Sequence, residues 1–203
     1  MALSHLLAGD GVAALSAIED CVDTTLPPEI VKAHALQIIG NKGKAVAVLE
    51  GYAFQCIVGL FNACPALAVL KAEDTQASEK WISAVLATAT AFEMEKANPL
   101  STGDLFLSYA HIMAIGNENG KALAALQKAA ELLAETSNYD EPFREAGPFD
   151  DLSELRAHMD VGNKAPRSER VIQDSLLAAL TQNPAFESLR AQPEFQAIVD
   201  RFR

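Results

Sequence analysis

None of the short motifs that mark common catalytic or nucleotide-binding sites occurs in this chain. There is no GxSxG, HExxH, CxxC or GxGxxG sequence, and there is no P-loop. Glu93 and Glu95 are two residues apart, so a helix would point their carboxylates in different directions. The four histidines are widely separated: His5, His34, His111 and His158. We therefore expect a protein that is not an enzyme and has no catalytic residue, metal site or cofactor.

Cysteine is scarce, with three residues in the whole chain. Cys56 and Cys64 lie eight residues apart, which is not a metal-ligand spacing. We expect these two residues and Cys21 to be buried, reduced thiols of a cytoplasmic protein. The first residues, MALSHLLAGDG, contain no basic segment and no long apolar core, so we expect no secretory signal.

Positive charge is also limited, because 16 Lys and Arg residues face 27 Asp and Glu residues. The formal net charge is −11 and no basic stripe is present. Nucleic-acid binding by neutralisation of phosphates is therefore not expected. An acidic surface keeps a protein soluble and also suits a basic partner, and the sequence leaves both interpretations open.

Aromatic residues make up only 6% of the chain, although 50% of its residues are hydrophobic. Much of the apolar content is Ala and Leu, which favour helix, and no segment alternates with the period of two that is typical of strands. We therefore predict an all-α protein. At 203 residues, a single domain spanning residues 1–203 with a sizeable core is expected.

The segment 104–133 predicts two antiparallel helices joined by a turn. Gly116 and Asn117 open this turn because both residue types tolerate positive φ. Asp104, preceded by Ser101 and Thr102, is expected to cap the first helix. The first helix carries apolar residues at spacings of three and four: Leu105, Phe106, Tyr109, Ile112 and Met113. The second helix places one apolar face toward its neighbours: Ala122, Leu126, Ala129, Ala130 and Leu133.

The same pattern occurs earlier in the chain. Ala33-His34 through Gly43-Lys44-Ala45 parallels Ala110-His111 through Gly120-Lys121-Ala122, and the two copies lie 77 residues apart. A weaker third copy begins at Ala8-Gly9-Asp10-Gly11 and continues with Ala13-Ala14-Leu15. Repeated helical hairpins are typical of an α-solenoid, in which each hairpin buries its apolar face against the next.

These hairpins resemble the tetratricopeptide repeat (TPR) family. A small residue in the first helix, Ala33 or Ala110, is followed twelve positions later by Ala45 or Ala122 at the start of the second helix. Ala129 stands seven positions further on, whereas the first copy has Tyr52 there. The resemblance covers about 70 residues well and implies an α-solenoid of degenerate TPR-like antiparallel hairpins.

The C-terminal phrase NPAFESLRAQPEFQAIVDRF is similar to the closing segment of many bacterial TPR proteins. Asn183 and Pro184 are suited to the N-cap and first position of a helix, and Phe195 begins an apolar i, i+3, i+4, i+7 pattern. We predict a final helix that covers the last hairpin. The predicted hairpin-like units lie near 2–22, 28–62, 66–97, 104–135 and 151–182, with the closing segment at 183–203.

No charged residue occurs from Gly51 to Leu70. Gln55, Asn62 and Pro65 interrupt this run, so over a membrane span we favour a helix from Gly43 to about Asn62 that is buried on most sides, followed by a break at Cys64-Pro65. Its inward side chains would be Ala45, Val48, Leu49, Tyr52, Cys56, Ile57, Leu60 and Phe61. An exposed apolar face used for contact with a second copy or another partner is the alternative.

The next predicted helix is long. Asp74, with Thr75 and Ser78, is expected to cap this helix, which runs through Ala97. Its inner face would carry Trp81, Val85, Ala89 and Phe92, and residues 98–103 are expected to form a linker.

The resemblance implies that first-helix side chains line a concave groove that binds a protein or peptide. The groove candidates are Ile30, His34 and Gln37 in the first copy, and Asp104, Leu107, Ser108 and His111 in the second. We therefore expect a non-enzymatic scaffold or adaptor. Two alternatives stay open: a small-ligand sensor or enzyme with a pocket between helices, and a dimerisation module that uses residues 51–70.

Overall fold

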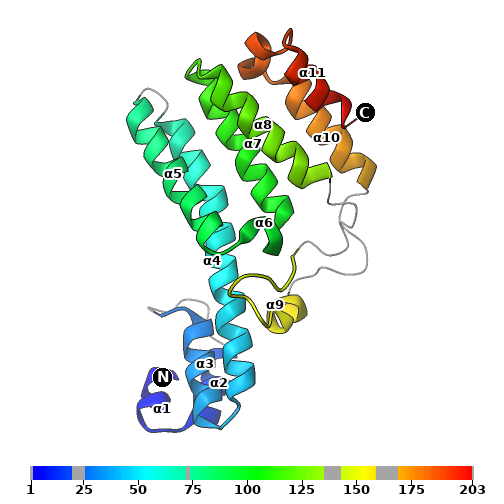
Figure 1. Ribbon diagram of the computed structural model, residues 1–203. Helices are drawn as coiled ribbons and strands as arrows, with labels where there is room; N and C mark the ends of the chain where they lie inside the picture. Colours follow the sequence, from blue (N-terminus) through cyan, green and yellow to red (C-terminus); the bar gives the residue numbers. More distant parts are fainter. Residues whose placement is uncertain (1, 20–25, 72–73, 135–142, 159–168, 203) are drawn as a thin grey trace. The chain divides into compact units, whose positions relative to one another are not determined.

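The computed structural model describes residues 2–19, 26–71, 74–134, 143–158 and 169–202. Over these residues the chain is helical and contains no strand, which confirms the predicted all-α class (Figure 1). The helices are α1 (Ala2–Leu7), α2 (Gly11–Glu19), α3 (Pro28–Ile38), α4 (Lys42–Leu70), α5 (Thr75–Ala91), α6 (Met94–Ala97), α7 (Pro99–Ile115), α8 (Asn119–Ala134), α9 (Ser153–His158), α10 (Glu169–Gln182), the 3₁₀ helix η1 (Pro184–Leu189) and α11 (Pro193–Asp200).

The chain divides into two compact units. Unit 1 consists of Met1–Cys56 and Phe149–Asp160, and unit 2 consists of Ile57–Pro148 and Val161–Arg203. Helix α4 contributes its first half to unit 1 and its second half to unit 2. The prediction of one domain over the whole chain stays a prediction.

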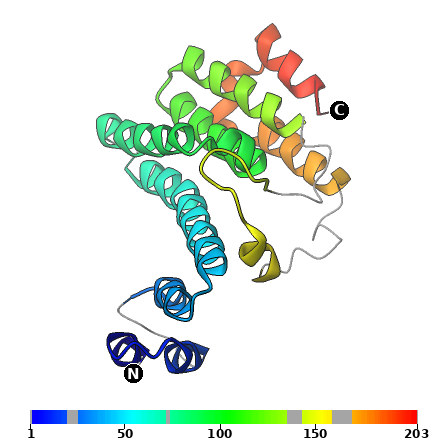
Figure 2. The same cartoon turned by 60° about the horizontal axis from the view of Figure 1, so that its bottom comes forward.

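Helices α7 and α8 of unit 2 run side by side and form the predicted hairpin (Figures 1 and 2). Leu105 and Met113 of α7 are buried, as predicted. The whole predicted face of α8 is also buried: Ala122, Leu126, Ala129, Ala130 and Leu133. The period of apolar residues in this segment therefore identified the packed faces correctly.

Helix α7 begins five residues earlier than predicted. Asn98 caps it, because its side-chain oxygen accepts the Ser101 N–H at 3.0 Å, and Pro99 occupies the first turn. Asp104 lies inside the helix and is not its cap. Gly103, which the sequence suggested as part of a linker, is a buried helical residue packed against Leu133 of α8.

Three helix–turn–helix connections share one backbone geometry. The second residue after the end of each first helix has positive φ: Gly9 (75°), Gly40 (83°) and Asn117 (61°). The next residue in each turn donates its N–H to the carbonyl five residues earlier. The N···O distances are 2.9 Å for Asp10, 2.8 Å for Asn41 and 2.8 Å for Glu118. The Gly9, Gly40 and Asn117 N–H groups donate to the carbonyl three residues earlier. This is the hydrogen-bond pattern of a Schellman motif, and it satisfies carbonyls that a helix end leaves free.

Helix α4 continues through Pro65, so the break predicted at Cys64-Pro65 is wrong. Proline removes one backbone hydrogen bond, which costs about 3 kcal/mol inside a helix. Pro65 is buried in unit 2, where its packing offsets part of this cost, and the flanking Cys64 and Ala68 are buried too. Tertiary packing therefore overrides the local signal of a helix end.

The long helix predicted from Asp74 through Ala97 is interrupted at Glu93. Asp74 caps α5 as predicted, accepting the Ala77 N–H at 3.0 Å. Glu93 adopts φ 49°, and the short helix α6 then directs Met94 into the core, where it has no exposed surface. Thr102 stabilises this corner, because its hydroxyl donates to the carbonyls of Met94 and Asn98 at 3.0 and 2.8 Å.

Burial along α4 and α5 differs from the predicted inward faces. Ala45, Val48, Ile57 and Phe61 are buried as predicted, and Phe54 joins them. Six residues predicted to be inside are not buried: Leu49, Tyr52, Cys56, Leu60, Trp81 and Phe92. Cys64 is buried as expected, and Cys21 lies outside the described residues.

Helix α4 is long and apolar enough, by length and composition, to cross a membrane. Its most apolar window of 18 residues is 33% buried in the structure, so the expectation of burial on most sides is not met. Leu60 is 43% exposed and Leu70 is 82% exposed. A core helix of a soluble protein passes the same length and composition test, which makes this weak evidence for a membrane span.

The C-terminal segment folds as predicted. Asn183 caps η1 by accepting the Ala185 N–H at 3.0 Å, and Pro193 begins α11. The apolar anchors of both elements are buried in the core of unit 2: Phe186, Leu189, Phe195, Ile198 and Val199. Unit 2 therefore ends on a turn and a helix that pack against α8.

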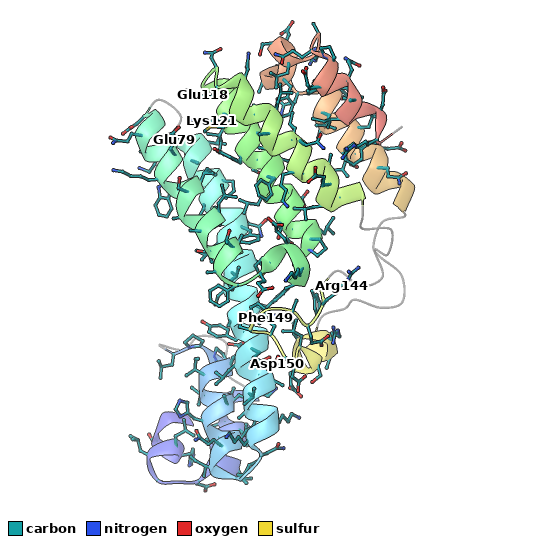
Figure 3. All side chains as sticks on the ribbon, in the orientation of Figure 1. Glu79, Glu118, Lys121, Arg144, Phe149 and Asp150 are labelled. Atoms are coloured by element: carbon teal, nitrogen blue, oxygen red, sulfur yellow. The ribbon has the colours of Figure 1, made fainter. Side chains whose placement is uncertain are left out.

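In unit 1, the segment before α9 is attached to α4. The Glu50 carboxylate accepts the N–H groups of Asp150 and Asp151 at 2.8 and 2.7 Å. The rings of Phe54 and Phe149 are both buried and meet edge to face with centroids 5.3 Å apart. Figure 3 shows Phe149 and Asp150 on this segment.

Candidate binding groove

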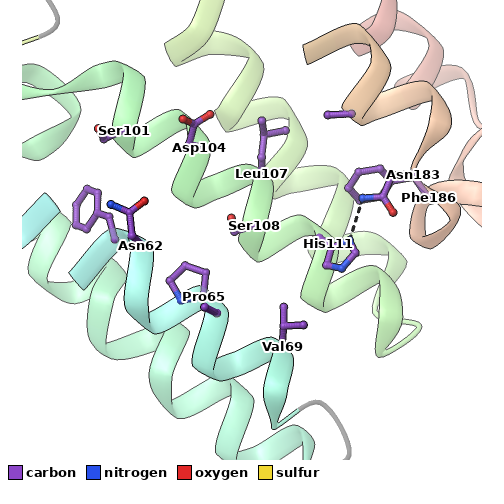
Figure 4. A pocket seen from close by; sticks show the side chains of 13 residues that line it. Asn62, Pro65, Val69, Ser101, Asp104, Leu107, Ser108, His111, Asn183 and Phe186 are labelled. Atoms are coloured by element: carbon purple, nitrogen blue, oxygen red, sulfur yellow. Dashed lines mark hydrogen bonds between the residues drawn. The ribbon is translucent and has the colours of Figure 1, made fainter. Parts of the chain in front are cut away.

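Unit 2 contains a half-open groove of about 450 Å³ between α4, α7 and the end of α10 with η1. Helix α7 forms its floor, and Figure 4 shows Asn62 and Pro65 on one side and Asn183 and Phe186 on the other. The lining residues are Phe61, Asn62, Pro65, Ala66 and Val69 of α4, Ser101, Asp104, Leu107, Ser108 and His111 of α7, and Ala179, Asn183 and Phe186.

All four groove candidates of the second copy line this groove: Asp104, Leu107, Ser108 and His111. The candidates of the first copy belong to unit 1. Ile30 and His34 line an apolar hollow of about 320 Å³ beside α1, and Gln37 is exposed outside it. The sequence analysis placed the candidates of both copies in one groove, and this stays a prediction.

His111 is held at the far end of the groove by Asn183. The Nδ2 atom of Asn183 lies 2.9 Å from Nδ1 of His111, and the Oδ1 atom of the same amide accepts the Ala185 N–H. Since a backbone N–H must face the amide oxygen, the amide nitrogen faces the ring and donates to Nδ1. A neutral His111 therefore carries its proton on Nε2. Phe186 meets the ring edge to face, with centroids 6.3 Å apart.

Partial burial lowers the pKa of His111 below its usual value of 6.5. A hydrogen bond with Asn183 opposes this shift if the amide offers its oxygen to a protonated ring. Here that oxygen is occupied by Ala185, so the amide NH₂ stabilises the neutral ring instead. Burial and hydrogen bonding therefore both favour a neutral imidazole.

Asp104 is an exposed residue, although protein atoms of the groove lie near its carboxyl. This desolvation raises the pKa of Asp104 above its usual value of 3.8, and no other cause contributes. Among the described residues, no cation or hydrogen-bond donor pairs with the carboxylate. The charge of Asp104 is thus available to a molecule that enters the groove.

Sequence reasoning missed the other walls of the groove. Asn62, Pro65 and Val69 fall in the uncharged run 51–70, and their side of α4 lines the groove. Asn183 was recognised as a cap, but its second contact joins residues 72 positions apart, which no local pattern indicates. Such contacts depend on how α4, α7 and η1 pack together.

The two titratable groups of the groove lie far apart along α7. Asp104 and His111 are seven residues apart on one helix, about 10.5 Å along its axis. Direct transfer of a proton between two groups requires a separation of about 3 Å, so Asp104 and His111 do not form a hydrogen-bonded acid–base pair. Among the described residues, no three His, Cys, Asp or Glu side chains gather in a way that would hold a metal ion.

Comparison of the chain with protein-family models, with curated proteins and with solved structures returns no match.

Proposed function

We propose that this protein is a non-enzymatic scaffold or adaptor that holds a short peptide segment of a protein partner in the groove of unit 2. The observation that supports this proposal is the convergence of Asp104, Leu107, Ser108 and His111 on one half-open groove. The α7 floor is mainly polar, with Leu107 as its one apolar side chain, and Phe61, Pro65 and Val69 add apolar side chains from α4. A few fixed polar groups among apolar side chains are what a binding site needs to orient a ligand. A binding role needs no catalytic geometry.

The proposal includes a degenerate TPR-like α-solenoid. The shared turn geometry at Gly9, Gly40 and Asn117 supports related hairpins at three places in the chain. Ala14, Ala45 and Ala122, each four residues after the N-cap position, are all buried. Small residues at these positions let neighbouring helices approach closely.

The length of the groove fits a short extended segment. From Ser101 to His111, α7 rises about 15 Å. An extended chain advances about 3.3 Å per residue, so about four or five residues of a peptide would lie along this floor.

A small-ligand sensor or enzyme is the second candidate. It is favoured by the shifted pKa values of Asp104 and His111 within one groove. A volume of about 450 Å³ also falls in the range that small ligands occupy. The separation of the two groups along α7 nevertheless argues for two contacts on an extended ligand.

Selection from a random peptide library displayed on phage, with the folded protein as bait, tests the proposal. The selected peptides are then titrated into wild type, Ala179→Trp and Ala124→Trp. Ala179 is an exposed residue of the groove wall, whereas Ala124 is an exposed residue of α8 that does not line the groove. We expect Ala179→Trp to abolish binding and Ala124→Trp to leave it unchanged.

Two outcomes would overturn the proposal. One is a library that yields no binder of the folded wild type. The other is a set of peptides whose affinity is the same for wild type and for a folded Ala179→Trp variant, with folding checked by circular dichroism. A library without binders, together with thermal stabilisation by small molecules, would favour the sensor.

A further inference from the structure

The groove has a single formal charge among the described residues that line it. Asp104 supplies that charge, and His111 is kept neutral at pH 7 by its surroundings. No Lys or Arg occurs in the lining. The groove is therefore suited to a positively charged group of a ligand. The net charge of the chain, −11, attracts cations as well.

Asp104 has no structural role that its contacts reveal. Some other carboxylates among the described residues have cationic partners: Glu154 is 3.1 Å from Lys32 and 3.4 Å from Lys44, and Glu95 is 2.7 Å from Lys128. Asp104 has none among the described residues, although the groove partly desolvates it. An unpaired, desolvated carboxylate costs folding free energy, and a cation from a bound molecule would offset that cost.

The surroundings of Asp104 define the rest of the ligand. Leu107, three residues after Asp104 on α7, and Val69 of α4, which is 42% exposed, offer apolar surface in the same groove. His111, about two helical turns away, presents the N–H of Nε2 as a donor. In an extended peptide, a separation of about 10 Å corresponds to about three residues.

We propose that the groove selects a peptide in which a Lys or Arg side chain binds Asp104 and neighbouring apolar side chains lie against Leu107 and Val69. An acceptor on the peptide, about three residues from the basic side chain, receives the Nε2 proton of His111. This inference rests on the proposed function and specifies its ligand.

The test uses the peptides selected on wild type and the Asp104→Asn variant. Glu194→Gln removes the same charge from an exposed residue of α11 outside the groove lining, so it is the matched control. We expect Lys or Arg to be enriched at one peptide position. Replacing that residue by Met should weaken binding to wild type about tenfold, and Asp104→Asn should weaken binding of the basic peptide equally.

The losses of binding free energy caused by the Met substitution in the peptide and by Asp104→Asn in the protein should not be additive. The Met-substituted peptide should bind wild type and Asp104→Asn alike, because the same ion pair is missing in both complexes. Glu194→Gln should leave every affinity unchanged. Asp104→Asn should also raise the melting temperature of the free protein at pH 7, so a loss of binding cannot come from unfolding.

Selected peptides without a preferred basic residue, or an unchanged affinity in Asp104→Asn, would overturn this inference. If Ala179→Trp still abolished binding, the proposed function would stand with a different specificity. If Ala179→Trp also left peptide binding unchanged, both the proposed function and this inference about its ligand would be wrong.

Discussion

Gly103 lies against Leu133 where α7 packs on α8. A Cβ atom at this position would be 2.6 Å from Cγ and 2.7 Å from Cδ2 of Leu133, whose side chain is buried. We therefore predict that Gly103→Ala lowers the free energy of unfolding by about 1–3 kcal/mol, the usual cost of overpacking. Urea unfolding followed by circular dichroism measures this change.

Gly120→Ala is the control for Gly103→Ala. A Cβ atom at Gly120, in the first turn of α8, meets nothing within 4 Å. This substitution should be neutral or stabilise the protein by up to about 1 kcal/mol, since Ala favours helix. Equal effects of the two substitutions would show that α7 and α8 do not pack as described.

The free energy of unfolding should depend on pH through His111, whose ring contacts Asn183. The pKa of His111 is below 6.5 in the folded protein. As the pH falls below 6.5, the unfolded chain therefore binds more protons at this residue than the folded protein does. The contribution of His111 to stability is complete above about pH 6.5 and is lost as the pH falls toward the folded pKa. Wild type should therefore lose more stability than His111→Gln between roughly pH 7.5 and pH 5.5.

The comparison of urea unfolding at the two pH values separates His111 from the other titrating groups. The same substitution at His34, an exposed residue of α3, is the matched control. A pH dependence that is identical in wild type and His111→Gln would contradict the assignment of a neutral, buried ring.

At the scale of the element, the turns at Gly40 and Asn117 are equivalent positions with different residues. Both have positive φ, and a Cβ atom at Gly40 would meet nothing within 4 Å. Gly40→Ala should thus destabilise the protein through backbone strain alone, by about 1–2 kcal/mol. Asn117→Gly should stabilise the protein, because Gly adopts positive φ more readily than Asn. The gain should be only about a few tenths of a kcal/mol, since Asn already tolerates this conformation better than most residues.

Thermal unfolding of both variants provides the measurement. Opposite signs are expected, and a stabilising Gly40→Ala would mean that the α3–α4 turn does not have the Schellman geometry.

Glu50 attaches the segment before α9 to α4 within unit 1. Hydrogen bonds to a charged acceptor contribute about 1.5–3 kcal/mol each. Glu50→Ala should therefore speed amide exchange at Asp150 and Asp151 by roughly tenfold or more, measured by NMR. Gln55→Ala, at an exposed position of the same helix, should leave these rates unchanged. Unaltered exchange in Glu50→Ala would contradict the attachment.

The sequence predicted the elements best where local chemistry decides them. The turns at Gly40 and Asn117 and the cap at Asn183 follow from residue type. The start of α7 was missed although Asn98-Pro99 carries the same cap signal as Asn183-Pro184. Pro65 was misinterpreted because buried packing, which the sequence does not display, stabilises the helix across it.

At the scale of the whole molecule, four of the 13 residues that line the candidate groove were predicted. These four residues, Asp104, Leu107, Ser108 and His111, lie on one helix, and the resemblance to TPR hairpins indicated them together. The α4 and α10–η1 walls come from packing between distant segments, which single-sequence patterns do not contain. The grouping of residues into two units was not predicted for the same reason.

Mapping a bound peptide on the protein tests the central claim most directly. The tightest peptide from the library would be titrated into isotope-labelled protein, and chemical-shift changes would be recorded for backbone and side chains. We predict that the largest changes occur from Ser101 to His111 on α7, with smaller ones at Asn62 and Asn183. Changes concentrated on α1 and α3 of unit 1, or on α11, would contradict the assignment of the groove as the binding site.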